Sequence, residues 1–224
     1  MHRSTLSSGI QLAHAAKALY ERGWMPGTSG NLSVRLPEPG GLALITAGGR
    51  DKGELTVQDM VEISVATGVL ARPARLGASP ESVLHAALYR TTTAGAVIHA
   101  HCPYATAAAT LTARGRKAAE PRHLRLERFE LLKGLGTGDP DRVDVPVLAN
   151  HADVERVADD VEDLLDTADD PPPVLLIADH GALAWGADLA RARDHLERLE
   201  SLCQLALLTR GAGPALDGPA TGSD

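Results

Sequence analysis

The stretch AVIHAHCPYAT, residues 96–106, places two histidines at the end of an apolar, partly β-branched run. Side chains on a strand alternate between its faces, so His99 and His101 are predicted to point the same way. Their Cα atoms would lie about 6.6 Å apart, and two imidazoles can converge from there on one metal ion. Cys102 would face the opposite side. The alternative is a pair of structural histidines that cap loop carbonyls, and the spacing alone leaves it open.

A metal site needs at least one more ligand, and His180 is the best placed candidate. It lies in ADHGA, a predicted turn between two apolar segments, where Gly181 lets the backbone bend. Three histidines would leave the fourth position of a zinc ion open, as catalytic sites require. The remaining histidines of the chain are His2, His14, His85, His123, His151 and His195.

Two glutamates are candidates for acid–base chemistry. Glu130 lies in RFELLKG, between a phenylalanine and two leucines, and partial burial there would make it a better proton donor. The alternative is an exposed glutamate that pairs with Lys133 or Lys117. Glu81 lies early in a predicted helix, four residues before His85, where an acidic residue also simply favours the positive end of the helix dipole.

Two glycine-rich loops, residues 27–31 and 48–49, expose backbone N–H groups that could bind a phosphate. Each loop alone is weak support, because most glycine-rich turns are only turns. Together with the serine that opens the helix after residue 78, they form a candidate phosphate cradle. Its members would be Ser29, Gly30, Asn31, Gly48, Gly49 and Ser79.

Composition excludes several classes of protein. The chain has 224 residues, 44% of them hydrophobic, and a net charge of −7, which argues against a nucleic-acid partner. No apolar run approaches the roughly 18 residues of a membrane helix, and the first ten residues lack the apolar core of a signal peptide. Only two cysteines occur, so we expect a reducing cytoplasm and no disulfide framework. The basic run 113–128 is interpreted as a solvated face.

The order of elements predicts an α/β fold with a mixed or antiparallel sheet, because strands are joined both by hairpins and by helices. A single domain is expected over residues 1–210, followed by a disordered tail, 211–224. Residues 125–135 are ambiguous, with a helical turn and a loop expected. Helices are predicted at 6–22, 79–92, 103–111, 152–167 and 187–209, and strands at 32–36, 42–46, 61–65, 94–101, 145–150, 174–178 and 182–186.

Six segments, in this order along the chain, resemble the class II aldolase superfamily: GWMPGTSGNLSVR, ITAGGRDKG, SPESVLH, VIHAHC, FELLKG and DHGALAWG. Within it they are most similar to the methylthioribulose-1-phosphate dehydratases of methionine salvage. The resemblance covers roughly residues 6–208. It implies a three-layer α/β/α fold around a central, mostly antiparallel sheet, assembled as a homotetramer.

The resemblance also implies roles for individual residues. The zinc ligands of the family fall on His99, His101 and His180, and the catalytic acid–base glutamate falls on Glu130. The aldolases proper use instead a glutamate that corresponds to Glu81. Gly48 stands where the family has a serine, so a hydroxyl that could contact phosphate is missing.

The predicted function is therefore that of a zinc-dependent lyase. It would dehydrate 5-methylthioribulose 1-phosphate to the 2,3-diketo product, with one zinc ion per subunit and Glu130 as the proton carrier. One alternative is a class II sugar-phosphate aldolase or 4-epimerase, which uses related metal-assisted chemistry on a C–C bond. A second is a non-catalytic scaffold of the same fold. The small-molecule sugar phosphate is the expected partner in the first two cases.

Overall fold

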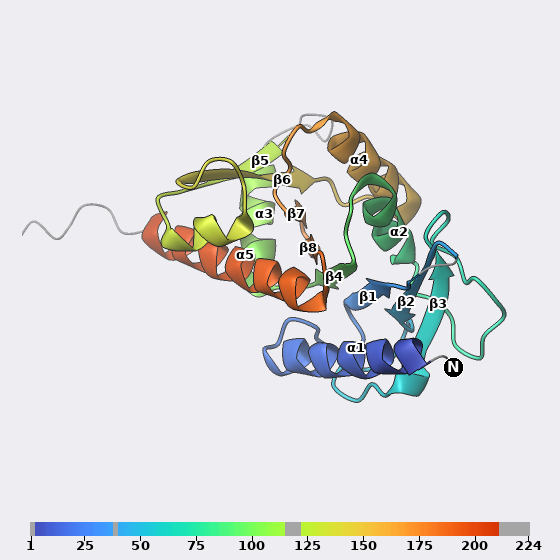
Figure 1. Cartoon of the computed structure of the whole chain (residues 1–224). Coiled ribbons are helices and arrows are strands. Elements are labelled where there is room, and N and C mark those ends of the chain that lie inside the picture. Colours follow the sequence, from blue (N-terminus) through green and yellow to red (C-terminus); the bar gives the residue numbers. More distant parts are fainter. Residues whose placement is uncertain (1–2, 38–39, 115–121, 211–224) are drawn as a thin grey trace, which may run out of the picture.

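A computed structural model of the chain describes residues 3–37, 40–114 and 122–210 (Figure 1). Its eight strands form one sheet in the order β3-β2-β1-β4-β8-β7-β6-β5. The strands are β1 (Asn31–Arg35), β2 (Leu42–Thr46), β3 (Met60–Ser64), β4 (Ala96–Ala100), β5 (Arg122–Glu127), β6 (Arg142–Leu148), β7 (Val174–Ile177) and β8 (Gly181–Gly186). The helices are α1 (Arg3–Glu21), α2 (Ser82–Thr91), α3 (Pro103–Ala113), α4 (Val154–Thr167) and α5 (Leu189–Arg210), with short 3-10 helices η1 (Val57–Asp59) and η2 (Glu130–Leu135).

The sheet is antiparallel at every pairing except one, between β6 and β7. The predicted hairpin of β1 and β2 is present, with Ser33 opposite Ile45. β4, which carries the histidine pair, lies between β1 and β8, strands that are distant from it in sequence. This arrangement confirms the predicted mostly antiparallel sheet and places β4 in its interior.

Helices cover both faces of the sheet, which confirms the three-layer α/β/α architecture (Figure 1). Apolar side chains of α1, α3 and α5 pack on one face, beside Ile98 of β4. Those of α2 and α4 pack on the other face, beside Val97. Consecutive residues of β4 thus enter different cores, as strand alternation requires. His99 shares the parity of Val97 and so belongs to the face that α2 covers.

Two predicted boundaries are wrong. Residues 122–127 form strand β5, which pairs with β6, where a helical turn and loop were expected from residue 125 onward. The alternation is present but was hidden by arginine, because Leu124 and Leu126 are buried while Arg125 is exposed. Helix α2 begins at Ser82, whereas Ser79 was expected as the N-cap and Pro80 as the first helical residue, because residues 79–81 form a turn before it.

Two further predictions fall partly or wholly outside the described residues. The tail 211–224 is one, and the central part of the basic run, 115–121, is the other. In the part of the chain that is described, no helix is both long and apolar enough to cross a membrane.

Candidate metal centre

His99 is the most buried of the candidate ligands, and its ring is oriented by the neighbouring strand. The side chain is fully buried, next to Asn31 of β1 and Leu183 of β8 across the sheet. Its Nδ1 lies 3.0 Å from the carbonyl oxygen of Ala182. Since a carbonyl only accepts, Nδ1 carries the proton and donates it, and Nε2 is left with a lone pair. That Nε2 has no hydrogen-bond partner among the described residues.

His101 and His180 complete a triangle of imidazoles with His99. The ring centroids lie 5.0 Å apart for His99 and His101, 4.8 Å for His99 and His180, and 4.9 Å for His101 and His180. Burial, followed by the charges of the other two histidines, lowers the pKa of His101 to about 4. A neutral imidazole is the form that binds metal.

His180 reaches the cluster through a tight turn between β7 and β8. Asp179 adopts a left-handed conformation with φ 57°, which Asp tolerates better than most residues. A Cβ on Gly181 would lie 2.5 Å from the carbonyl oxygen of Ala100, so only glycine lets β8 start this close to the end of β4. The turn therefore brings His180 against a strand that precedes it by 80 residues.

Glu81 is the fourth member of the cluster. Its Oε1 lies 3.0 Å from Nε2 of His180 and 3.4 Å from Nε2 of His99. Burial alone would raise the pKa of Glu81, but the close approach of the His180 and His99 imidazoles outweighs it and holds that pKa well below its usual range. Donor atoms of Glu81, His99, His101 and His180 all lie within 4.8 Å of one another.

These four side chains fit a divalent metal ion. Three imidazoles and one carboxylate are a donor set typical of zinc, and the unpartnered lone pair of His99 is an atom that a metal would satisfy. The structure thus brings together the three histidines predicted from the sequence. It adds Glu81, which the sequence indicated by its four-residue spacing from His85 and by its correspondence to the glutamate of the aldolases.

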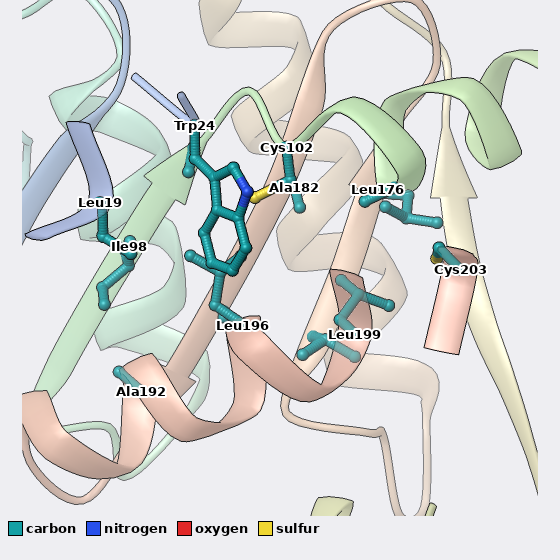
Figure 2. Close-up of a cluster of buried hydrophobic side chains, with 14 of the residues drawn as sticks. Leu19, Trp24, Ile98, Cys102, Leu176, Ala182, Ala192, Leu196, Leu199 and Cys203 are labelled. Carbon is teal, nitrogen blue, oxygen red and sulfur yellow. The ribbon is translucent and has the colours of Figure 1, made fainter. Parts of the chain in front are cut away.

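Cys102 lies outside this cluster, as the alternation along β4 predicted. Its side chain is fully buried in the core that α1, α3 and α5 form, where Figure 2 shows it beside Trp24. Burial, followed by the charges of Glu200 and Cys203, raises the pKa of the thiol well above its usual value. A protonated thiol in an apolar core is a packing residue and not a ligand.

The candidate phosphate cradle is assembled beside the histidines, although not all of its members offer free groups. Asn31 Nδ2 lies 3.2 Å from Ser79 Oγ, and a Cβ on Gly48 would lie 3.2 Å from Ser79 N. A Cβ on Gly30 would lie 2.9 Å from the carbonyl oxygen of His99. Ser29 instead donates its hydroxyl to the carbonyl of Pro26. Gly49 has a left-handed φ of 67°, which completes the turn after Gly48.

Lys52, in the GRDKG segment, joins the two loops of the cradle and was not identified from the sequence. Its Nζ donates to the carbonyl oxygens of Thr28 and Arg50, each at 2.8 Å, and its side chain is 1% exposed. Burial lowers the pKa of Lys52, although the charge of Glu81 opposes that shift. The signal in the sequence was a lysine within a glycine-rich loop, which is too common to be specific.

Glu130 lies apart from the cluster. It begins η2, which packs against α5, and its side chain is 83% exposed, so the expected partial burial is wrong for a single chain. Its carboxylate pairs with Lys133 at 2.9 Å, the alternative that the sequence had left open.

The fold agrees with comparisons to known proteins. The family described as class II aldolase and adducin N-terminal domain matches residues 10–207, and the chain belongs to that family. A solved structure of L-fuculose-1-phosphate aldolase from Thermus thermophilus is similar, with a TM-score of 0.69 and 30% identity over 95% of this chain and all of that one.

Curated relatives are more similar in sequence. A methylthioribulose-1-phosphate dehydratase of Sorangium cellulosum is 39% identical over 92% of this chain and 93% of its own length. A probable bifunctional methylthioribose-1-phosphate isomerase/methylthioribulose-1-phosphate dehydratase of Nocardia farcinica is 46% identical over 90% of this chain. The chain spans only 35% of the length of that second relative.

Proposed function

We propose that the protein is a zinc-dependent lyase that dehydrates 5-methylthioribulose 1-phosphate to 2,3-diketo-5-methylthiopentyl 1-phosphate, a step of methionine salvage. The proposal is supported by relatives named for this dehydration that are 39% to 46% identical over most of the chain. The observation that carries it within the molecule is the cluster of three imidazoles around the unpartnered Nε2 of His99.

His99, His101 and His180 would hold the metal ion, one per subunit. When bound, a zinc ion supplies Lewis-acid chemistry that makes a proton next to a carbonyl more acidic. The chain itself would contribute rigidity, because His99 is fixed by Ala182 and His180 by the turn before Gly181. Rigid ligands keep the reacting part of the sugar in one orientation, which lowers the entropic part of the barrier.

The phosphate of the substrate would lie in the cradle that Asn31, Gly48 and Ser79 line. The buried ammonium of Lys52 adds positive charge between the two loops, which favours a phosphate over a neutral group. Ser79 would supply a hydroxyl, and Gly49, which has open space beside its Cα, leaves room for close approach of the ligand to the backbone.

Glu130 is proposed as the proton carrier. Because its carboxylate is exposed on the single chain and is not part of the described cluster, it would act on a site of a second copy. A homotetramer, as the resemblance implies, would supply that copy. Glu130 would then protonate the departing hydroxyl, or carry the proton that leaves the neighbouring carbon.

A sugar-phosphate aldolase is the second candidate. It is favoured by the position of Glu81 within the cluster, at the place where the aldolases of the superfamily have their glutamate. It is also favoured by the likeness to the Thermus thermophilus aldolase.

Mass spectrometry of the products separates the candidates. The zinc-loaded protein is incubated separately with 5-methylthioribulose 1-phosphate and with fuculose 1-phosphate. Loss of one water from the first, with the second unchanged, is the expected result. Cleavage of the second to an aldehyde and dihydroxyacetone phosphate would establish the aldolase, and no reaction with either would favour a scaffold.

The zinc content of single variants tests the ligands. His99→Ala, His101→Ala and His180→Ala should each lose most of the metal, whereas His14→Ala, in α1, should keep about one ion per chain.

Two free, buried cysteines further favour a reducing compartment such as the cytoplasm. We also propose that residues 1–210 form one domain.

A further inference from the structure

Polar side chains of β1 and α2 form a buried ladder that ends at the metal centre. Four residues along a helix rise about 6.0 Å, and two residues along a strand rise about 6.6 Å, so the two spacings match. Polar residues spaced by four along α2 therefore face, one after another, polar residues spaced by two along β1. The ladder consists of Glu81, His85 and Tyr89, on α2 or in the turn before it, and Asn31, Ser33 and Arg35 on β1.

The hydrogen bonds of the ladder all run toward Glu81. An ionised carboxylate only accepts, so Asn31 Nδ2 donates to Glu81 Oε2 at 2.7 Å, and Asn31 Oδ1 is left to accept from Nε2 of His85. His85 Nδ1 then accepts the hydroxyl of Ser33 at 2.7 Å. The oxygen of Ser33 in turn accepts the hydroxyl of Tyr89 at 2.7 Å. The second hydrogen of Asn31 Nδ2 is directed at Ser79 Oγ, 3.2 Å away, and the tautomer of His85 is determined.

Burial makes this arrangement hard to change. His85 and Ser33 are fully buried, and a flipped Asn31 amide would point its NH₂ at the N–H of His85 and its oxygen at the carboxylate of Glu81. Burial, followed by the charge of His99, lowers the pKa of His85 to about 3 and keeps the ring neutral. At the far end, Arg35 donates to the carbonyl of Tyr89 at 2.6 Å, and its guanidinium lies 4.7 Å from the ring centroid.

We propose that His85 is a positioning residue, which acts through Asn31 to hold the carboxylate of Glu81 against the histidine cluster and thereby sets the affinity of that cluster for a divalent metal ion. The inference rests on the metal site of the proposed function and adds to it a control by residues that do not touch the metal. Groups that orient a ligand in this way typically change metal affinity by about 10–100-fold when they are replaced.

Two substitutions of His85, by glutamine and by asparagine, differ only in how far the side-chain amide extends. The amide nitrogen of glutamine lies near the position of Nε2, so His85→Gln can still donate to Asn31. Asparagine reaches only the position of Nδ1, so His85→Asn keeps the contact to Ser33 and loses the one to Asn31. Zinc affinity is measured for both by competition with a chromophoric chelator. We expect a loss of about 10–100-fold for His85→Asn, and His85→Gln should lie close to wild type.

A matched control is available in His195, a second buried histidine, whose Nδ1 bonds to the carbonyl oxygen of Trp185 on the opposite face of the sheet. His195→Asn should leave zinc affinity unchanged. A double-mutant cycle with Glu81→Gln then separates positioning from general damage. If His85 acts through Glu81, the two losses do not add, and the double variant binds zinc about as weakly as Glu81→Gln alone.

Three results would overturn the ladder: an affinity of His85→Asn equal to that of His195→Asn, equal losses in His85→Gln and His85→Asn, or additive losses in the cycle. If His85→Asn does not fold, Ser33→Ala carries the test, since it frees Nδ1 of His85, and an unchanged affinity there counts against the proposal. A wild-type protein that binds zinc but converts neither sugar phosphate refutes the proposed function alone, because the affinity measurements need no substrate.

Discussion

Single residues bring the metal centre together for different local reasons. His99 faces the cluster because of strand alternation, His101 comes directly after the strand, and His180 depends on the left-handed Asp179 before it. Glu81 arrives from the turn that precedes α2. Because these local causes are independent, replacing one ligand should weaken the metal centre and leave the other ligands in place.

Replacing Glu130 by glutamine is expected to lower turnover, whereas replacing Glu81 by glutamine is expected to lower zinc affinity. Glu130→Gln keeps the size of the side chain but cannot exchange a proton, so kcat should fall by about 10²–10⁴-fold with KM little altered. Zinc content should stay normal, because Glu130 is not part of the cluster. Glu81→Gln should instead lower zinc affinity, since it removes the negative charge beside His99 and His180.

Steady-state kinetics at saturating zinc and metal analysis after dialysis check both variants. Normal turnover in Glu130→Gln together with an inactive, zinc-replete Glu81→Gln would transfer the proton chemistry to Glu81. That outcome would contradict the role proposed for Glu130 and favour the aldolase.

Cys102→Ser tests whether the thiol belongs to the core and not to the metal. Zinc content and most of the activity should remain. Stability should fall by about 1–3 kcal/mol, the typical cost of a buried hydroxyl without a partner. A serine directly before a helix usually stabilises it by accepting from the first backbone N–H groups. At the start of α3, however, Glu200 already accepts from the N–H groups of Tyr104 and Ala105, so the new hydroxyl gains no such bond. Urea unfolding and metal analysis measure the two effects, and a large loss of zinc would be the contrary result.

At the scale of elements, the loop between β2 and β3 is held in place by Asp59. Its carboxylate accepts from Thr56 N at 2.9 Å, from the Thr56 hydroxyl at 2.8 Å and from Arg50 Nε at 2.9 Å. Burial would raise the pKa of Asp59, yet these bonds from Thr56 and Arg50 outweigh it and lower that pKa below its ordinary value of 3.8. The loop they hold includes Lys52, which joins the cradle.

Asp59→Asn should therefore destabilise the protein by about 1 kcal/mol at neutral pH, because the charged hydrogen bonds are weakened. A folded-state pKa below the unfolded one gives stability that is present above pH 3.8 and is lost as the pH falls through the folded value. The difference between variant and wild type should thus shrink in acid. Urea unfolding from pH 7 to pH 3 measures it, and a difference that stays constant with pH would argue against an ionised Asp59.

At the scale of the whole molecule, the exposed position of Glu130 predicts sites shared between copies. Alone, Glu130→Gln should be about 10²–10⁴-fold slower than wild type, and His180→Ala should be inactive. When the two are unfolded together and refolded as a mixture, about a quarter of the sites would combine an intact Glu130 with an intact histidine cluster, for random assembly. Activity should return to about that fraction, as measured by the dehydration assay. Mixtures without any recovery would show that Glu130 does not act across copies.

The sequence by itself determined much of the fold and part of the site. Alternation in residues 96–101 predicted a buried strand with two histidines on one face, and ADHGA predicted a turn with a third, because periodicity and turn chemistry are local properties. The hairpin of β1 and β2 and the helix α4 were predicted for the same reason. Strand β5 was missed because the exposed Arg125, between two buried leucines, obscures its short alternation.

Only the tertiary structure decided which glutamate lies at the histidines. Glu81 and Glu130 have equally suggestive local sequences, but the cluster forms where β4, β8 and the start of α2 meet, and those segments are up to 100 residues apart. The polar ladder depends in the same way on α2 lying along β1. There, residues four apart on the helix contact residues two apart on the strand. Contacts between distant segments are set by how the whole sheet is ordered, and no local pattern contains that order.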